Sequence, residues 1–339
     1  MKIGLTLLHY DFSYPDGGPV TWEGVAASAR RAEELGFDSV WISDHFFLSL
    51  ERYGGGEELQ GAAEPMATLA GVAAITERVR LGTLVLASSF RHPAIVAKAA
   101  TTIDLLSGGR LDLGIGAGWY EDEYRAFGYP FGSTGDRFEI LEESAEVLNL
   151  LFDDELEREG ITWEGNRFRL NEAHSRPRPT QSPRPPLWIG GKGGPRLAKL
   201  LARRADGWNT CWAWTADAYA EKAKLVDEAC EREGRDPSSL RRNLGLYTLV
   251  GEDEADLVAR FRSLQGWTPG GALDGTLLEE WGRDKLVGTP DTVIERLADF
   301  AALGVEEVIV SAGALPFSLY DETMLDVIAE AVIPRAHAL

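Results

Sequence analysis

The chain has 339 residues, 44% hydrophobic and 26% charged, a composition that excludes a disordered protein and suffices for one large barrel or two medium domains. Its 34 basic and 54 acidic residues give a net charge of −20, which opposes binding to nucleic acid and to anionic membrane surfaces. The sequence lacks an apolar run of roughly 20 residues that could span a bilayer, and its first residues resemble a strand rather than a signal peptide, so we expect a cytoplasmic protein.

Short apolar and β-branched runs alternate with amphipathic helical stretches along the whole chain, a pattern typical of βα units around a parallel sheet. The predicted strands, in chain order, are Lys2–Leu8, Ser39–Ser43, Val79–Leu86, Leu111–Gly116, Leu187–Gly190, Gly207–Thr210, Leu244–Val250 and Glu307–Ser311. Because no long Pro/Gly/Ser linker divides these eight strands, the pattern favours one α/β domain over residues 1–339, a single (β/α)8 TIM barrel, over a doubly wound open sheet.

Two predicted helices have clear boundaries. Thr21 is placed to cap the first, and Gly36 ends it. Another begins at Pro93 and closes at Ser107-Gly108-Gly109, with Arg110 opening the next strand.

Two segments exceed the minimal βα unit, residues 119–186 after strand four and about 266–286 after strand seven. Within the first, residues 161–168 alternate around a Gly-Asn turn, which predicts a small hairpin outside the barrel. Barrel insertions are usually lids or specificity loops, and a plain surface excursion is the alternative.

Residues at the carboxyl ends of barrel strands converge on one mouth, where barrel enzymes carry their active sites. Strand two ends in Ser43-Asp44-His45, which places a carboxylate and an imidazole at that mouth. Histidine titrates near neutrality and can pass a proton at a reacting centre. The alternative is structural, with Asp44 capping the loop and His45 filling a polar gap.

Strand four leads into Gly114-Ile115-Gly116-Ala117-Gly118-Trp119. Glycines at alternate positions allow a ligand or another backbone to approach closely. The GxGxG spacing differs from the dinucleotide fingerprint, and packing inside the barrel explains the glycines equally well.

Strand five is followed by Gly190-Gly191-Lys192-Gly193-Gly194-Pro195-Arg196, which predicts an anion cradle of backbone N–H groups at a helix start, with phosphate as the guest. The surrounding segment 175–205 contains no acid, and its basic residues are Arg176, Arg178, Arg184, Lys192, Arg196, Lys199, Arg203 and Arg204. A flexible turn followed by a solvated basic helix is the alternative.

Other chemistries have weaker support. The five histidines show neither HxH nor HExxH spacing, and Cys211 and Cys230 lack metal-ligand spacing, so we expect no metal site. A metal-dependent barrel hydrolase with ligands from separate strands is a remaining rival. A serine hydrolase is disfavoured because there is no GxSxG elbow.

The ordered motifs resemble the bacterial luciferase-like superfamily, and in particular its branch dependent on the deazaflavin coenzyme F420. The resemblance rests on Ser-Asp-His-Phe after strand two, Leu-Gly-Thr-Leu-Val-Leu and Phe-Arg-His-Pro-Ala at strand three, Ser-Gly-Gly-Arg before Gly-Ile-Gly-Ala-Gly-Trp, and the glycine-rich loop after strand five. It implies a barrel with insertions, a homodimer, a flavin or deazaflavin at the mouth and a phosphate site after strand five.

Carried over residue by residue, the resemblance implies that Asp44 and His45 lie beside the deazaflavin ring and that His45 assists proton or hydride chemistry. It also implies a non-prolyl cis peptide at Leu84–Val85, behind the ring. The expected cofactor-lining residues are Ala87, Gly116, Ala117 and Gly118, and the expected phosphate-binding residues are Gly190, Gly191, Lys192 and Gly193, with Arg196 adding charge.

One position departs from the family pattern. Related deazaflavin-dependent sugar-phosphate dehydrogenases carry an acidic glutamate directly after the third glycine of the Gly-x-Gly-x-Gly run, where this chain has Trp119. The departure argues against sugar-phosphate oxidation and indicates a ring that shapes the substrate pocket. Glu123 is the candidate substitute acid.

The leading hypothesis is therefore an F420-dependent oxidoreductase that transfers a hydride between the deazaflavin and a small organic substrate. The alternative within the superfamily is an FMN-dependent monooxygenase that uses reduced flavin and oxygen. A third hypothesis is a flavin-binding protein without turnover.

Overall fold

The computed structural model describes residues 1–339, except for the side chain of Glu157. Eight parallel strands close into a barrel in the order β10, β11, β12, β14, β1, β2, β5 and β7, and β7 pairs with β10 to complete the ring. The barrel strands are β1 (Lys2–Thr6), β2 (Ser39–Ile42), β5 (Arg80–Thr83), β7 (Leu111–Gly116), β10 (Leu187–Gly190), β11 (Gly207–Trp212), β12 (Arg241–Val250) and β14 (Glu307–Ser311). The predicted (β/α)8 TIM barrel and its eight strands are confirmed.

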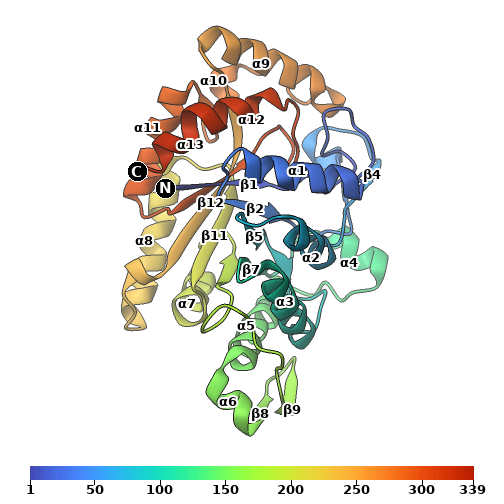
Figure 1. Ribbon diagram of the computed structural model, residues 1–339, viewed down its shortest axis with the longest axis vertical. Coiled ribbons are helices and arrows are strands. Elements are labelled where there is room, and N and C mark those ends of the chain that lie inside the picture. Colours follow the sequence, from blue (N-terminus) through green and yellow to red (C-terminus); the bar gives the residue numbers. More distant parts are fainter.

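Helices surround the barrel (Figure 1). They are α1 (Trp22–Glu34), α2 (Pro65–Ile75), α3 (Pro93–Ser107), α5 (Thr134–Phe152), α7 (Pro195–Arg204), α8 (Ala216–Arg232), α11 (Pro290–Ala302), α12 (Thr323–Val327) and α13 (Ile333–Ala336), the last two joined by a π-helical turn. The predicted caps are present: Thr21 Oγ1 accepts a hydrogen bond from the Gly24 N–H at 3.1 Å, and Gly108 ends α3 with φ 65°.

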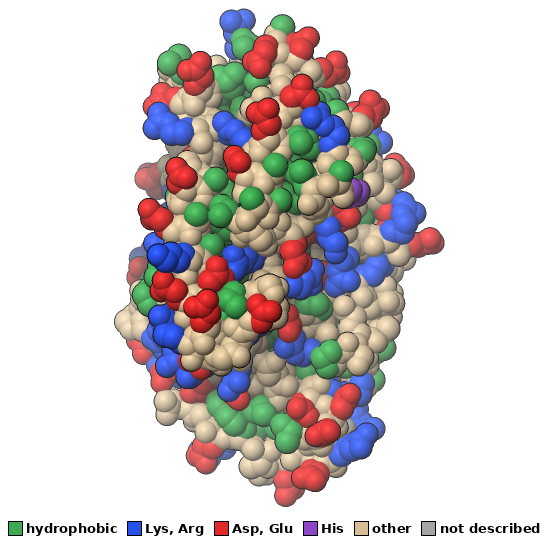
Figure 2. Space-filling model, turned by 90° about the vertical axis from the view of Figure 1, so that its left-hand side faces the viewer, with side chains coloured by type: hydrophobic (Ala, Val, Ile, Leu, Met, Phe, Trp, Pro, Cys, Tyr) green, Lys and Arg blue, Asp and Glu red, His purple; other side chains and the backbone are tan. Residues whose placement is uncertain are grey.

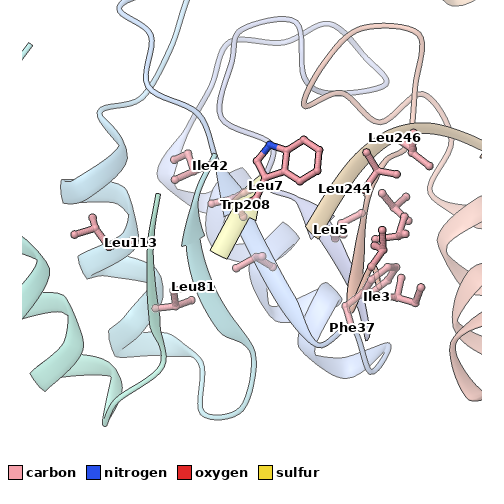
Figure 3. Packing of buried hydrophobic residues seen from close by; sticks show 14 of the residues in the cluster. Ile3, Leu5, Leu7, Phe37, Ile42, Leu81, Leu113, Trp208, Leu244 and Leu246 are labelled. Atoms are coloured by element: carbon pink, nitrogen blue, oxygen red, sulfur yellow. The ribbon is translucent and has the colours of Figure 1, made fainter. Parts of the chain in front are cut away.

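The core lies on both sides of the strands. Between strands and helices, apolar side chains such as Leu5, Leu81 and Leu113 are fully buried or nearly so (Figure 3). Inside the barrel, the rings of Trp41 and Trp188 meet edge to face, with centroids 6.0 Å apart. This interior is therefore filled by side chains, and functional groups are confined to its ends.

The predicted long segment after β7 contains α4 (Glu121–Phe127), α6 (Asp154–Glu159), β8 (Ile161–Glu164) and β9 (Arg169–Ala173). Strands β8 and β9 pair antiparallel, which confirms the predicted hairpin. The hairpin lies at one end of the molecule, far from β4 and α4 (Figure 1), and its turn is tied to α5 by Glu143, which accepts the Asn166 N–H. The hairpin is therefore held against α5.

The segment after β12 contains α9 (Glu254–Trp267), a 3-10 turn (Pro269–Gly271), α10 (Leu278–Trp281) and β13 (Leu286–Gly288). The sequence interpretation missed a third excursion, after β2, made of β3 (Phe47–Ser49), a 3-10 turn (Glu51–Tyr53) and β4 (Leu59–Gly61). The two excursions touch, because a Cβ built on Gly270 would lie 1.9 Å from the Gly54 carbonyl oxygen.

Candidate functional site

His45 lies at the carboxyl end of β2 and is held by Glu123 from α4. The His45 Nδ1 atom is 2.8 Å from Glu123 Oε2, and the Glu123 side chain is only 1% exposed. The other carboxylate oxygen, Oε1, accepts the backbone N–H groups of Phe46 and Phe47. Because a carboxylate only accepts, Nδ1 is the donor, and Nε2 carries the lone pair. The predicted residues His45 and Glu123 thus form a hydrogen-bonded pair, with Glu123 on the Nδ1 side of the imidazole.

Asp44, the neighbouring candidate, points toward the loop between β5 and α3. Its Oδ2 accepts from Arg91 at 2.6 Å and from the Ala87 N–H at 2.8 Å, and its Oδ1 accepts from Arg91 at 2.9 Å. Arg91 also reaches Glu64 at 2.7 Å. These contacts make Asp44 a brace between β2 and the loop that begins α3, the structural role that the sequence left open.

The glycines of β7 and β10 surround Val85. The Leu84–Val85 peptide is cis, as the family resemblance implied. Added Cβ atoms on Gly114, Gly116 and Gly190 would lie 2.8, 2.6 and 2.7 Å from methyl carbons of Val85. Contact with Val85 restricts Gly116 and Gly190 to glycine, whereas at Gly114 an added Cβ would first meet the Thr83 carbonyl oxygen at 2.1 Å. Val85 is the side chain that forms this wall.

Gly118 and Trp119 follow β7 at the mouth. Gly118 has φ 75°, and an added Cβ would lie 1.9 Å from the Tyr124 hydroxyl, so only glycine fits there. Ala117 is partly buried beside it, whereas Trp119 is 47% exposed. The Trp119 ring meets the His45 imidazole edge to face at 5.4 Å. The predicted ring is therefore adjacent to the predicted proton carrier.

The glycine-rich loop after β10 presents open hydrogen-bond donors. The backbone N–H groups of Lys192, Gly193 and Gly194 bond to no described residue, and Gly194 gives α7 no side-chain cap. The Lys192 side chain is exposed and makes no ion pair with the described residues. Thr210 lies one residue beyond the partner of Gly190 in β11, and its buried hydroxyl also has no partner in the described chain. These groups fit an anion.

The basic segment around this loop is largely neutralised in space. Arg196 makes a two-point contact with Glu142 of α5, at 2.7 and 2.6 Å, and this hydrogen bonding raises the pKa of Arg196. Arg203 pairs with Glu233 at 2.8 Å. On the face that Figure 2 shows, acidic and basic side chains are interspersed. The charge that Arg196 was expected to add to the predicted cradle is therefore largely engaged by Glu142, whereas Lys192 forms no ion pair with the described residues.

Several aromatic residues at the mouth escaped the sequence interpretation. Tyr53 comes from the excursion after β2, Trp212 ends β11 and Tyr247 lies in β12. The centroids of the Trp212 and Tyr247 rings are 5.6 Å apart, and Tyr53 is close enough to help raise the pKa of the Tyr247 phenol. The only available signal was that Trp212 and Tyr247 occupy the carboxyl-terminal parts of strand segments.

A neutral hydrogen-bonded chain supports the β1 and β2 ends below His45. His9 Nδ1 is 2.8 Å from the Leu7 carbonyl oxygen, so it donates, and Nε2 accepts from Ser43 Oγ at 2.9 Å. Tyr10 then donates to Ser43 Oγ at 2.5 Å. Burial lowers the pKa of His9 to about 3, which keeps the chain uncharged.

Within the described residues, no group of three or more His, Cys, Asp or Glu side chains has a metal-binding arrangement. No described helix combines the length and apolarity needed to cross a bilayer.

Comparison with known proteins gives the family. The model for luciferase-like monooxygenases matches residues 1–307. An F420-dependent glucose-6-phosphate dehydrogenase of Kineococcus radiotolerans is 34% identical over 247 residues, which cover 72% of this chain and 68% of the relative. An F420-dependent hydroxymycolic acid dehydrogenase of Mycobacterium tuberculosis is 29% identical, with 98% of this chain and 88% of the relative covered.

Solved structures agree on the architecture. The monooxygenase RslO1 from Streptomyces bottropensis matches with a TM-score of 0.76 and 25% identity over all of both chains. An F420-dependent secondary alcohol dehydrogenase, solved with an F420-acetone adduct, matches with a TM-score of 0.75 and 21% identity over 99% of this chain and 98% of that chain, which shows the fold alone. With its barrel, its ordered motifs and a family match over residues 1–307, the chain belongs to the luciferase-like monooxygenase family.

Proposed function

We propose that this protein is an F420-dependent oxidoreductase that transfers a hydride between the deazaflavin and a small organic substrate at the carboxyl-terminal mouth of the barrel. The relatives named as F420-dependent dehydrogenases support the cofactor. The open N–H groups of the loop after β10 support the binding of its phosphate. When bound, F420 supplies the ring carbon that takes or gives the hydride.

The described residues fit such a cofactor. Lys192, Gly193 and Gly194 would hold the phosphate, with the Thr210 hydroxyl nearby. Val85 packs on glycines of the paired strands β7 and β10 and forms a wall against which a flat ring would lie. Ser88, which follows Ala87 at the mouth, has a buried hydroxyl without a partner in the described chain, so a polar ring edge would satisfy it.

The His45–Glu123 pair is the observation that carries the proposal. Glu123 holds Nδ1–H at 2.8 Å, which leaves the lone pair of His45 Nε2 for a proton. With F420 bound to supply the carbon that takes the hydride, His45 Nε2 would accept the hydroxyl proton of a carbinol substrate. In the reverse direction the imidazolium returns it to the developing alkoxide. The charge of Glu123 stabilises the imidazolium that forms in either direction.

Titration of the purified protein with oxidised F420 and with FMN, followed by fluorescence, tests the cofactor assignment. We expect saturable binding of F420 that is tighter than binding of FMN. Binding of FMN at micromolar or lower concentration without any response to F420 would overturn the proposal.

An FMN-dependent monooxygenase is the second candidate, and the full-length match to the monooxygenase RslO1 favours it. The two candidates differ in their use of oxygen. Reduced FMN with substrate would consume oxygen if the monooxygenase assignment is right, whereas an F420-dependent dehydrogenase would reduce F420 equally well under nitrogen.

We further propose that the protein acts in the cytoplasm as a homodimer. Exposed apolar side chains on α3, namely Ile95, Leu105 and Leu106, support association of two copies. Light scattering coupled to gel filtration measures the mass, and a monomer at micromolar concentration would refute this assignment.

A further inference from the structure

The wall of the mouth nearest His45 is aromatic. Trp119 meets the imidazole edge to face at 5.4 Å, and Tyr120 lies 6.2 Å from it. Across the mouth, Trp212 packs edge to face on Phe317 at 5.2 Å. These rings come from the loop after β7, the end of β11 and the loop after β14, so several βα units contribute to this wall.

Two hydroxyl groups in this wall are free to bind a ligand. No hydrogen bond joins the hydroxyl of Tyr53 or Tyr247 to a described residue. Burial raises the pKa of both phenols, so they stay neutral and can donate to an oxygen. They lie near the thiol of Cys211, whose pKa burial raises to about 12.

Tyr53 is fixed over the mouth by the contact between two excursions. A Cβ on Gly54 would lie 2.3 Å from the Cβ of Ala272, and one on Gly270 would lie 1.9 Å from the Gly54 carbonyl oxygen. The turn that carries Tyr53 therefore fits closely against the segment after α9. This contact places the free phenol opposite β12, where Tyr247 is located.

The cations near the mouth are already engaged or lie at its rim. Arg91 is bound to Asp44 and Glu64, and Lys192 belongs to the glycine-rich loop. The Arg52 guanidinium carbon lies 4.3 Å from the centre of the Trp119 ring, and the Arg52 side chain is exposed. Apart from the glycine-rich loop, the described residues at the mouth thus form no cluster of unpaired basic groups of the kind that binds a substrate phosphate.

We propose that the substrate is a neutral aromatic carbinol or the corresponding aromatic ketone, whose ring packs against Trp119 and Trp212 and whose oxygen accepts a hydrogen bond from Tyr247 or Tyr53. This inference rests on the proposed function. In the oxidation, the carbinol C–H bond breaks with hydride transfer to oxidised F420, and the hydroxyl proton passes to His45. The products are the ketone and reduced F420, so two electrons and two hydrogen atoms leave the alcohol.

Reduction of F420 by a small panel of alcohols tests the substrate class. We expect kcat/KM for 1-phenylethanol to exceed the values for 2-propanol and glucose 6-phosphate by about tenfold or more, because burial of an aromatic ring adds binding energy. A higher value for either comparison substrate, or no turnover of 1-phenylethanol by protein that binds F420, would overturn the inference. Failure to bind F420 would instead overturn the proposed function.

Variants of the two tyrosines test the residue assignment. Tyr247→Phe and Tyr53→Phe should together lower kcat/KM for 1-phenylethanol by about tenfold while F420 affinity stays unchanged, because a hydrogen bond to the substrate oxygen is lost. Tyr219→Phe is the matched control, since the Tyr219 hydroxyl also has no partner in the described chain but lies behind β11, stacked on Trp208. Unchanged kinetics in the double variant would overturn the assignment.

Binding without turnover gives an independent measurement. Acetophenone added to the F420-loaded protein should change the tryptophan fluorescence in a saturable way, and Trp119→Leu should remove most of the change. An equal response in the variant would place the aromatic ligand elsewhere and contradict the inference.

Discussion

Acid should destabilise this protein through His9, the fully buried imidazole between the Leu7 carbonyl and Ser43. Its pKa falls from the ordinary 6.5 to about 3 because burial disfavours the charged form. In the unfolded chain the imidazole binds a proton below about pH 6.5, and in the folded protein it does so only near pH 3. The unfolded state therefore binds more protons in this window, so stability rises with pH and is lost as the pH falls below about 6.5.

The size of the effect follows from the same two pKa values. Each pH unit between them costs about 1.4 kcal/mol, so full titration from pH 6.5 to 3 removes about 5 kcal/mol, and acidification to pH 5 removes about 2 kcal/mol. This is a substantial share of the roughly 5–15 kcal/mol that stabilises a typical domain.

Urea unfolding of wild type and of His9→Gln at about pH 7.5 and about pH 5 measures the contribution. The variant loses the hydrogen bonds of His9 at both pH values, but its stability should fall by about 2 kcal/mol less than that of wild type on acidification. His92→Asn is the matched control, because His92 is exposed and asparagine keeps the acceptor at the start of α3. The same acid-induced loss in wild type and His9→Gln would refute the reasoning.

Three more predictions concern single side chains. Glu123→Gln should lower kcat by about a hundredfold with a small change in F420 affinity, because the neutral amide no longer stabilises the imidazolium of His45. Stopped-flow reduction of F420 measures the rate, and an unchanged rate would exclude the stabilising role of Glu123. Lys192→Ala should weaken F420 binding about tenfold and Arg196→Ala much less, because Arg196 is paired with Glu142. Fluorescence titration compares the two affinities, and equal losses of F420 affinity would contradict the conclusion that Glu142 engages the charge of Arg196. Burial raises the pKa of Glu307, so the native carboxyl holds its proton to higher pH than the unfolded one, and its contribution to stability is lost as the pH rises, opposite in sign to that of His9. In urea unfolding, the stability of Glu307→Gln relative to wild type should therefore increase between about pH 4 and about pH 8, and a relative stability that falls would refute this assignment.

The barrel strands and helix ends were predictable because local signals determine them. Each buried strand is a short apolar run, and residues such as Thr21 and Gly108 act on their own helix ends. The excursion after β2 was missed because residues 51–58 are mostly charged or glycine, without apolar alternation. Its conformation depends on contact with a segment more than 200 residues later, which no local pattern reveals.

The candidate site was predictable in part for the same reason. His45 and the glycine-rich loop stand out as motifs, and Glu123 was named as an acid, but its position under the imidazole depends on how α4 packs. The acid-free segment looked strongly basic because its acidic partners lie elsewhere in the chain, Glu142 on α5 and Glu233 after α8 among them. Tyr53 and Tyr247 belong to elements almost 200 residues apart, so their joint presence at the mouth required the folded structure.

Val85 and the glycines that enclose it constrain how this family member can diverge. Enlarging Gly116 or Gly190 by one methyl group collides with Val85, whereas shrinking Val85 alone leaves a void where it packs on the glycines of β7 and β10. Either change is harmful alone, and a pair of compensating changes restores the fit. These positions should consequently vary together among descendants, and an engineer who wants a deeper mouth has to alter them as a group.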